Sequence, residues 1–321
     1  MPIYPDAIEL TACDHLAVCR VSGADARAFL QSQLTQDVER VTASAAALAG
    51  FCTAQGRLWA SMVLLQGQQE QEVLALMRAD LLESFLKRIR MFVLRSKVSF
   101  EVLDQWHVCG VHVHRAGGEL ALAGQPVHET WAAVNDQAKH WIRLPSAKPD
   151  LVRLLVLGPD DPKPTIESTL GAPTSLVADT VAWQAADMAA GLGWIQAKTQ
   201  DLFIAQTLNL DLVGGVSFTK GCFPGQEVVA RAHYRGTVKR RMHLAHVQSP
   251  DAPLEPGMDV FVAAEPDSPV GRLIDVVQAN GHATVLFEAP FKTIQTSTLC
   301  AGSASGQALE LGELPYTLEP V

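Results

Sequence analysis

After residue 241 the chain becomes a succession of short segments in which apolar and polar residues alternate. The segments read MHLAHV, DVFVAA, GRLIDVVQ and HATVLFE, and the turns between them include SPDAPLEPG, EPDSPVG and ANG. Short strands at regular spacing, joined by proline- and glycine-rich turns, are typical of small closed β-domains. The pattern therefore predicts a C-terminal β-barrel domain over residues 241–321.

The first 240 residues combine strands and helices without the one-for-one alternation of a parallel α/β fold. Apolar residues recur at helical spacing in GADARAFLQSQL and in the stretch after Asp80, whereas ALAGFCTAQGRLWASMVLL indicates two strands that turn at Gln55 and Gly56. This mixture predicts an α+β region of residues 1–240 with two sub-lobes and a boundary near residue 105. Whether the sub-lobes are interleaved in sequence stays open at this point.

The composition is that of an acidic globular protein. With 321 residues, of which 48% are hydrophobic and 18% charged, the chain is long enough for two or three lobes. The formal net charge of −9 opposes binding along a phosphate backbone and leaves only local basic patches for anions. No stable nucleic-acid partner is therefore expected.

Neither a secretion signal nor a membrane span is expected. The stretch MPIYPDAIELTACDHLAV lacks a basic region followed by an apolar one, and no apolar run approaches the ~20 residues of a membrane span. The cysteines lack CxxC spacing, which indicates reduced thiols in the cytoplasm. They are Cys13, Cys19, Cys52, Cys109, Cys222 and Cys300. Because the histidines show no HxH or HExxH spacing and a lone cysteine cannot hold a cluster, no metal site is predicted.

One segment, FTKGCFPGQEVVARAHYRGTVKRR at residues 218–241, gathers glycines and cations around a single thiol, Cys222. Pro224 suits the first position of a helix and Glu227 falls in its first turn, so a helix is expected over PGQEVVARAHY. Cys222 would then lie just before a helix N-terminus. The positive end of that helix, together with Lys220, favours the thiolate.

Two features of this segment remain open on the residues alone. Cys222 is either a reactive thiol or a small buried hydrophobe in a tight turn. The six lysines and arginines from Lys220 to Arg241, opposed by one acid, form either an anion-binding patch or a solvated helix face. Gly221 and Gly225 allow a positive φ or a close approach of the backbone to a ligand.

The stretch KGCFPGQEVVAR, residues 220–231, resembles the signature of the YgfZ-type folate-binding proteins, which reads Lys-Gly-Cys-aromatic-x-Gly-Gln-Glu. The stretches SGADARAFLQSQLTQDV, TAQGRL, LRSKV, WQAADMAAG, NLDLVGGVSF and YRGTVKRR follow the order of that family, so the resemblance covers roughly residues 15–245. The family is related to the T-protein, the aminomethyltransferase of the glycine cleavage system.

The resemblance implies a three-lobed fold around a folate-sized cavity, ending in a small β-barrel, with tetrahydrofolate or another folate as the ligand. It also implies a role in assembling or repairing iron–sulfur clusters, with effects on the tRNA-modifying enzymes that carry such clusters. Iron–sulfur proteins or cluster-assembly factors are the implied partners, and no membrane is among them.

The same resemblance assigns roles to the residues of the segment. Cys222 is the functional thiol, and Lys220 beside it is the second catalytic candidate. Four residues shape the loop around the thiol, which is expected to be recessed: Gly221, Gly225, Gln226 and Glu227. The glutamate tail of a folate would meet cations further along, because a guanidinium group fits a carboxylate. The arginines among residues 231–241 are the expected partners of the tail. The cofactor-binding candidates are the four loop residues together with Arg231, Tyr234 and Arg235.

Two departures from the T-protein pattern argue against the aminomethyltransferase reaction. T-proteins carry Gly-x-x-Asp-Asp after the hairpin turn, where this chain reads GRLWA with Trp59 and Ala60. They carry Arg-Leu-Glu-Ala-Gly where this chain reads DMAAG, with Ala189 at the glutamate position. Aminomethyl transfer to tetrahydrofolate needs a base and an anchor for the pterin amine. We therefore expect a folate-binding accessory protein in place of that transferase.

Two other functions stay open as alternatives. A tetrahydrofolate-dependent one-carbon transferase would be identified by turnover of a methylene or formyl group. An RNA-facing adaptor that uses Arg231 to Arg241 would show a steep salt dependence of tRNA binding, although the net charge of −9 counts against it. The sequence does not decide whether the protein catalyses a reaction.

Overall fold

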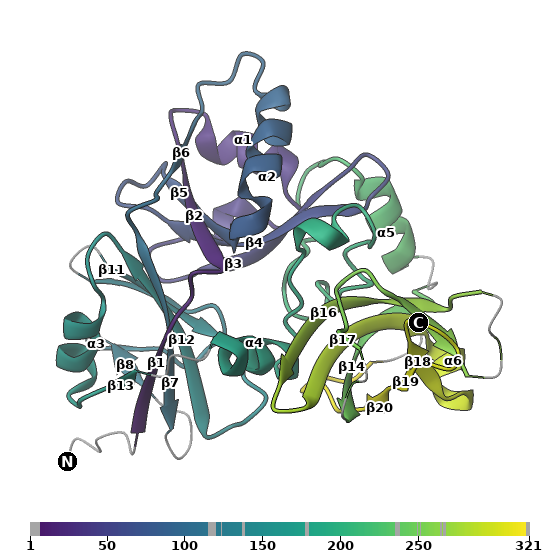
Figure 1. Ribbon diagram of the computed structural model, residues 1–321. Helices are drawn as coiled ribbons and strands as arrows, with labels where there is room; N and C mark the ends of the chain where they lie inside the picture. The colour runs from purple at the N-terminus through teal and green to yellow at the C-terminus, as the bar shows by residue number, and fades with distance from the viewer. Residues whose placement is uncertain are drawn as a thin grey trace.

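The computed structural model describes residues 7–114, 120–122, 124–136, 139–176, 180–234, 238–248, 250, 252–263, 265 and 268–318. Its strands form three large sheets, of five, six and seven strands, and a small ribbon of β8 (Ala121–Leu122) and β9 (Gln125–Pro126). Figure 1 shows the three sheets as three lobes, with helix α4 (Thr180–Ala189) lying between two of them. The α+β class expected from the sequence is confirmed.

The five-stranded sheet is antiparallel and has the order β3-β4-β5-β2-β6. Its strands are β2 (Leu16–Ser22), β3 (Ala47–Cys52), β4 (Leu58–Gln66), β5 (Val73–Arg78) and β6 (Ser99–Val102). Helices α1 (Ala26–Gln33) and α2 (Leu82–Ile89) pack on it. The rings of Phe29 and Phe100 lie 6.0 Å apart and those of Phe51 and Phe85 5.5 Å apart, so aromatic edges join helix to strand.

The six-stranded sheet has the order β10-β11-β12-β7-β1-β13 and contains one parallel pair, β1 with β13. Its strands are β1 (Ala7–Ala12), β7 (His107–His114), β10 (Ala133–Asp136), β11 (Lys139–Leu144), β12 (Leu151–Gly158) and β13 (Ser175–Leu176). Helix α3 (Lys163–Leu170) follows β12. The chain begins in this sheet with β1, leaves it for the five-stranded sheet and returns at β7, so the two sheets are interleaved in sequence.

The seven-stranded sheet is the C-terminal barrel, with the order β19-β18-β15-β16-β17-β14-β20. Its strands are β14 (Arg240–Gln248), β15 (Asp259–Val262), β16 (Gly271–Ala279), β17 (His282–Pro290), β18 (Leu299–Ala301), β19 (Gln307–Ala308) and β20 (Glu310–Leu311). Because β19 and β20 follow each other in the chain and lie at opposite ends of this order, the sheet is nearly closed. The barrel expected from the alternating segments is confirmed. Helix α6 (Phe291–Thr296) follows β17.

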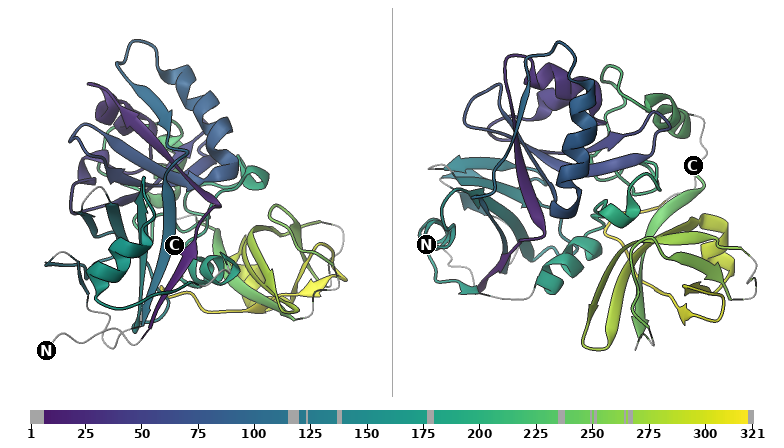
Figure 2. Two further views of the ribbon diagram at one scale, coloured as in Figure 1. Left: turned by 60° about the vertical axis from the view of Figure 1, so that its left-hand side comes forward. Right: turned by 45° about the horizontal axis from the view of Figure 1, so that its top comes forward.

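One buried core joins the three lobes. Trp183 and Met188 of α4, Ile274 of β16 and Phe51 of β3 belong to the same apolar cluster. Helix α4 packs against β1, β16 and β17, and therefore touches two of the sheets. The barrel stands to one side of the other two lobes (Figure 2). Short 3₁₀ turns complete the fold: η1 (Val38–Arg40), η2 (Ala79–Leu81), η3 (Arg90–Phe92) and η5 (Ala197–Thr199).

Candidate functional site

The signature cysteine lies on a loop that ends at helix α5 (Gln226–Tyr234). Cys222 is exposed on this loop. Among the other cysteines, Cys109 is half-buried. The remaining four are buried: Cys13, Cys19, Cys52 and Cys300. The resemblance implied a recessed loop, but the loop is not recessed around the sulfur, and the thiol is open to solvent.

Lys220 is turned toward helix α1. Its ammonium group donates to the carbonyl oxygens of Gln31, Leu34 and Gln36, at 2.5, 2.7 and 3.1 Å. These carbonyls lie at and just beyond the C-terminal end of α1, where acceptors lack intrahelical donors and a cation is favoured. An ammonium group has three hydrogens, so all of its donors are used. Burial lowers the pKa of Lys220 to about 8.

These contacts make Lys220 an anchor of the loop, while its direct action on the thiol stays a prediction. On the other side of the thiol, Phe223 is buried in the main core, and its ring centre lies 5.5 Å from the ammonium nitrogen of Lys220. Earlier in the loop, the hydroxyl of Thr35 donates to the carbonyl of Gly215 at 2.6 Å. The residues on both sides of Cys222 are thus fixed to the protein.

Residues Phe223 to Gln226 form a β-turn in which the amide of Gln226 donates to the carbonyl of Phe223 at 3.1 Å. Pro224 takes the second position of the turn and Gly225, with φ +79°, the third, which is the pattern of a type II turn. Helix α5 consequently begins at Gln226, two residues later than expected, because a left-handed residue cannot be part of a right-handed helix. The expected position of Cys222 directly before a helix N-terminus is wrong.

Gly225 lies directly against the hairpin turn between β3 and β4. A Cβ atom at this position would lie 2.5 Å from the carbonyl oxygen of Thr53 and 2.6 Å from Cα of Gly56. Gly56 is left-handed as well, with φ +75°, and a Cβ there would lie 2.7 Å from Cβ of Val228. The two glycines therefore allow the backbone of the signature segment to rest on the hairpin.

The same hairpin holds a carboxylate that the sequence did not reveal. Asp201 has φ +59°, and its Oδ1 accepts a hydrogen bond from the hydroxyl of Thr53 at 3.2 Å. Its carbonyl oxygen accepts from the guanidinium group of Arg57 at 3.2 Å. The hairpin strand lacks the two acids of T-proteins, but an acid from a segment 148 residues away lies at its turn.

The folate-binding candidates around α5 are largely solvent-facing. Three of them are exposed: Glu227, Arg231 and Tyr234. The side-chain amide of Gln226 donates to the carbonyl of Gly221 at a long 3.4 Å, and a Cβ at Gly221 would meet nothing within 4 Å. Arg235 lies outside the described residues.

The cations of the segment do not form one patch. Arg240 pairs with Glu288 of β17 at 2.6 Å. Arg241 is 3% exposed and makes two parallel bonds to the carboxylate of Asp211, at 2.6 and 2.9 Å. The expected anion-binding patch is reduced, among the described residues, to two exposed cations without an ion pair, Arg231 and Lys239.

A second group of polar side chains, here called the junction, lies where the lobes meet. It comprises His15 after β1, Arg78 at the end of β5, Asp187 on α4 and Asp275 on β16. Both ring nitrogens of His15 and Nε of Arg78 are buried without a hydrogen-bond partner in the described structure, although Nε of Arg78 lies 3.9 Å from the carboxylate of Asp80 and forms an ion pair with it. Buried polar atoms without a hydrogen-bond partner are rare in folded proteins, so these atoms are candidates for hydrogen bonds to a polar ligand.

The junction contains a carboxyl group with a raised pKa. Burial raises the pKa of Asp275 to about 6, although Arg78 and two hydrogen bonds favour its ionised form. Those bonds come from the side-chain amide of Gln196 at 2.5 Å and the backbone amide of Val276 at 2.9 Å. Burial also lowers the pKa of His15 to about 4, with a further contribution from Arg78. At neutral pH the junction therefore holds a neutral imidazole.

Asp187 forms a buried ion pair that supports the junction. Its Oδ1 lies 2.5 Å from the guanidinium group of Arg153, and its Oδ2 accepts from the indole of Trp194 at 3.0 Å. Arg153 also lies over the ring of Trp183, 4.5 Å from its centre. The pair ties β12 to α4, and Asp187 is a core residue.

Over the described parts of the chain, no group of three or more His, Cys, Asp or Glu side chains is placed to hold a metal ion. Among the same residues, no helix is both long and apolar enough to cross a membrane.

The comparisons with known proteins identify sequence relatives over three quarters of the chain. No protein-family model matches it. It is 36% identical to the tRNA-modifying protein YgfZ of Edwardsiella ictaluri over 75% of this chain and 72% of that protein. It is 30% identical to the protein of the same name from Yersinia pseudotuberculosis over the same shares of both chains.

Among solved structures, the glycine cleavage system aminomethyltransferase T of Bartonella henselae matches with a TM-score of 0.70. The match covers 97% of this chain and 87% of that one at 14% identity, and it therefore establishes the fold. The three-lobed fold with its C-terminal barrel is that of the aminomethyltransferase, and by its sequence the chain belongs to the YgfZ family.

Proposed function

We propose that this protein is a cytoplasmic folate-binding accessory protein that supports the assembly or repair of iron–sulfur clusters and, through cluster enzymes, tRNA modification. One observation carries the proposal: Cys222 is exposed on a loop whose flanking residues are anchored. The name of the relatives, tRNA-modifying protein, supports the last part of the role.

An anchored, exposed thiol suits a brief contact with a partner. Because Lys220 and Phe223 fix the loop on both sides of the sulfur, little conformational entropy is lost when a partner meets it. A thiolate is both a ligand for iron and a nucleophile toward an oxidised cysteine. A single sulfur does not hold a cluster permanently, so the cluster is cargo of the reaction and belongs to the partner.

We assign the folate to the junction of the three lobes. A folate offers ring nitrogens and carboxylates, and these groups fit the orphaned polar atoms of His15 and Arg78. Arg78 would meet an anionic group, and Asp275 would accept an N–H of the pterin ring. When bound, a reduced folate would supply one-carbon chemistry at its ring nitrogens.

One short segment joins the junction to the cysteine loop. Its first residue, Gln196, donates to Asp275, and its last, Asp201, accepts from Thr53 on the hairpin beneath Gly225. Occupancy of the junction by a folate can therefore influence the loop that presents the thiol.

A tetrahydrofolate-dependent one-carbon transferase is the second candidate, and Asp201 favours it because this carboxylate lies at the turn of the β3–β4 hairpin. The two residues that replace the T-protein acids do not favour it. Ala60 is fully buried, and the guanidinium carbon of Arg88 lies 4.2 Å from the ring centre of Trp59. Turnover of a methylene or formyl group on tetrahydrofolate by the purified protein would establish this function.

The role of the thiol is tested by complementation. In cells that lack the protein, Cys222→Ser should fail to restore the activity of iron–sulfur enzymes, whereas Cys109→Ser, a change at the half-buried cysteine of β7, should restore it. Thermal unfolding of both purified variants is the control for folding, because a change at an exposed position costs within about 0.5 kcal/mol. Full complementation by Cys222→Ser would overturn the role.

The place of the folate is tested by calorimetry with tetrahydrofolate. Arg78→Gln should weaken binding by roughly tenfold or more, because a charge-assisted hydrogen bond is lost. Arg231→Gln, at an exposed arginine of α5, should change the affinity less than about twofold. The reverse result would indicate that the folate binds at α5 and not at the junction. If tetrahydrofolate does not bind at millimolar concentration, both placements are contradicted.

A further inference from the structure

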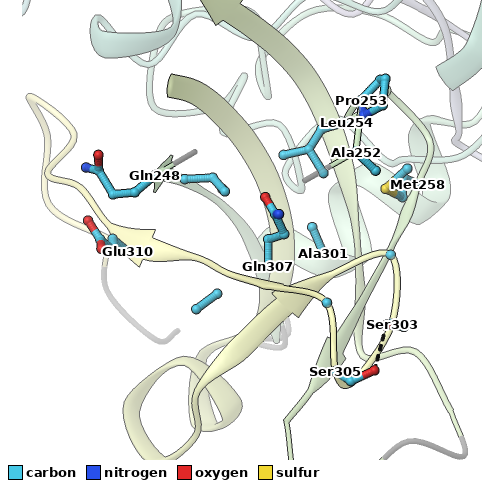
Figure 3. Close-up of a pocket in the computed structure, with 14 residues that line it drawn as sticks. Gln248, Ala252, Pro253, Leu254, Met258, Ala301, Ser303, Ser305, Gln307 and Glu310 are labelled. Carbon is cyan, nitrogen blue, oxygen red and sulfur yellow. Dashed lines mark hydrogen bonds between the residues drawn. The ribbon is translucent and has the colours of Figure 1, made fainter. Parts of the chain in front are cut away.

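The C-terminal barrel contains a pocket that the proposed function does not use. It lies where the end of the chain changes partner, since β19 pairs with β18 but β20 pairs with β14. Between these two strands, the amide of Leu309 donates to the carbonyl of Leu299 at 2.8 Å. The chain thus leaves the end of β14 uncovered, and a pocket of about 480 Å³ opens there (Figure 3).

The described lining of this pocket combines apolar and polar residues and contains no cation. Val247, Leu254 and Ala301 are buried and form its apolar part together with the half-buried Met258. Among the described residues of the lining, Glu310 is the one that carries a charge, and none is a lysine, arginine or histidine. A partly apolar lining with a single carboxylate suits a neutral or cationic molecule with an apolar body and disfavours an anion such as a folate or a phosphate.

Gln307 supplies the pocket with a polar group. Its side chain extends into the pocket near Ala301 (Figure 3), and its Oε1 is buried without a hydrogen-bond partner among the described residues. A buried amide oxygen that lacks a donor is unfavourable, so a rotation of the side chain that turns this oxygen into the pocket would be stabilised by a hydrogen bond from a molecule that enters. An amide oxygen accepts and cannot donate, so the partner must carry an N–H or O–H group.

We propose that this pocket binds a small molecule with an apolar body and an N–H donor, such as a primary amine. The apolar body lies against Leu254, Met258 and Ala301, and the nitrogen donates to Oε1 of Gln307 once that side chain has turned toward the ligand. The carboxylate of Glu310, an exposed residue of the lining, favours a positive charge. This ligand differs in chemistry from a folate, and the described lining of the site shares no residue with the junction or the cysteine loop.

The test is methyl NMR of the full chain labelled at its methionines, with the signal of Met258 as the reporter. Phenethylamine is the probe, and 3-phenylpropionate, which has a similar body and a negative charge, is its control. We expect saturable shifts of the Met258 signal with the amine and roughly tenfold weaker binding of the carboxylate. Equal binding of the two would overturn the charge argument, and no shift with the amine would overturn the site.

The role of Gln307 is tested separately. Gln307→Leu should weaken binding of phenethylamine roughly tenfold, while Gln248→Leu, which removes an exposed amide of the same pocket, should change it less than about twofold. If Gln307→Leu does not fold, the ligand can be changed in its place. N,N,N-trimethylphenethylammonium keeps the charge but has no N–H, so it should bind roughly tenfold more weakly than phenethylamine, and equal affinity would exclude the hydrogen bond.

Discussion

Lys220 and Cys222 are two positions apart on one loop, yet their side chains lie in different environments. The ammonium group of Lys220 is held by three carbonyl oxygens near the end of α1, whereas Cys222 is exposed. A lysine side chain is long and flexible, so closeness in sequence does not determine what its charge contacts. Here the cation stabilises the loop conformation that presents the sulfur.

Lys220→Met is expected to lower the free energy of unfolding by about 3 kcal/mol, because three buried carbonyl groups lose a charged donor while the length of the side chain is kept. The matched control is Lys198→Met. Lys198 pairs with Glu255 at 2.7 Å in solvent, so its loss should cost less than about 0.5 kcal/mol. Urea denaturation measures both, and equally small effects would show that Lys220 is not an anchor.

At the scale of elements, the position of α5 depends on its contact with the β3–β4 hairpin. Gly225 and Gly56 are both left-handed and allow the two backbones to touch. The type II turn at Pro224 ends the loop and starts the helix, so the hairpin, the turn and the thiol form one unit. A side chain at Gly225 would separate them.

Gly225→Ala is therefore expected to destabilise the protein by at least about 2 kcal/mol, since the new methyl group meets Thr53 at 2.5 Å and the residue is held at φ +79°. Gly221→Ala should be nearly neutral, within about 1 kcal/mol, because nothing lies within 4 Å of its Cβ position. Thermal unfolding and the rate of Cys222 alkylation by a maleimide report on both. A neutral Gly225→Ala variant would contradict the contact.

The sequence was informative about which elements form and less so about where they end. The four alternating segments after residue 241 are strands β14 to β17, because the period of a half-buried strand is visible locally. The start of α5 was expected two residues too early. At α1 and α2 no side chain caps the first turn, because the carboxylates that precede these helices have distant partners. The carboxylate of Asp25 accepts from the amide of Lys97 at 2.7 Å, and that of Asp80 from the amide of Ala197 at 3.0 Å.

At the scale of the whole molecule, the junction brings together residues from all three lobes. His15, Arg78, Asp187 and Asp275 are far apart in the sequence, and no local pattern groups them. The resemblance correctly implied three lobes and a barrel, because a family conserves the arrangement of its elements. It gave no information on the charges at their meeting point, since these depend on how the barrel packs against α4.

The burial of Asp275 makes stability depend on pH. Its pKa rises from 3.8 to about 6 on folding, so the native state holds its proton more tightly than the unfolded chain does. The native state therefore bears the full cost of an ionised buried carboxylate above about pH 6 and none of it below about pH 4. Asp275→Asn removes that cost. At about pH 8 the variant should be more stable than the natural protein by up to about 3 kcal/mol, and at about pH 4 equally stable.

The measurement is the difference in the free energy of unfolding between the two proteins from about pH 4 to about pH 8. The difference is used, and not the stability of one protein, because other groups titrate as well. Burial lowers the pKa values of four histidines to about 4, so both proteins lose stability as the pH falls below the ordinary histidine pKa of 6.5. That contribution cancels between them. Asp259→Asn, at a half-buried carboxylate of the same barrel that pairs with Arg272 at 2.8 Å, is the control and should differ by less than about 1 kcal/mol throughout. A stability difference for Asp275→Asn that does not change with pH would show that this carboxyl group is not the one that titrates at the junction.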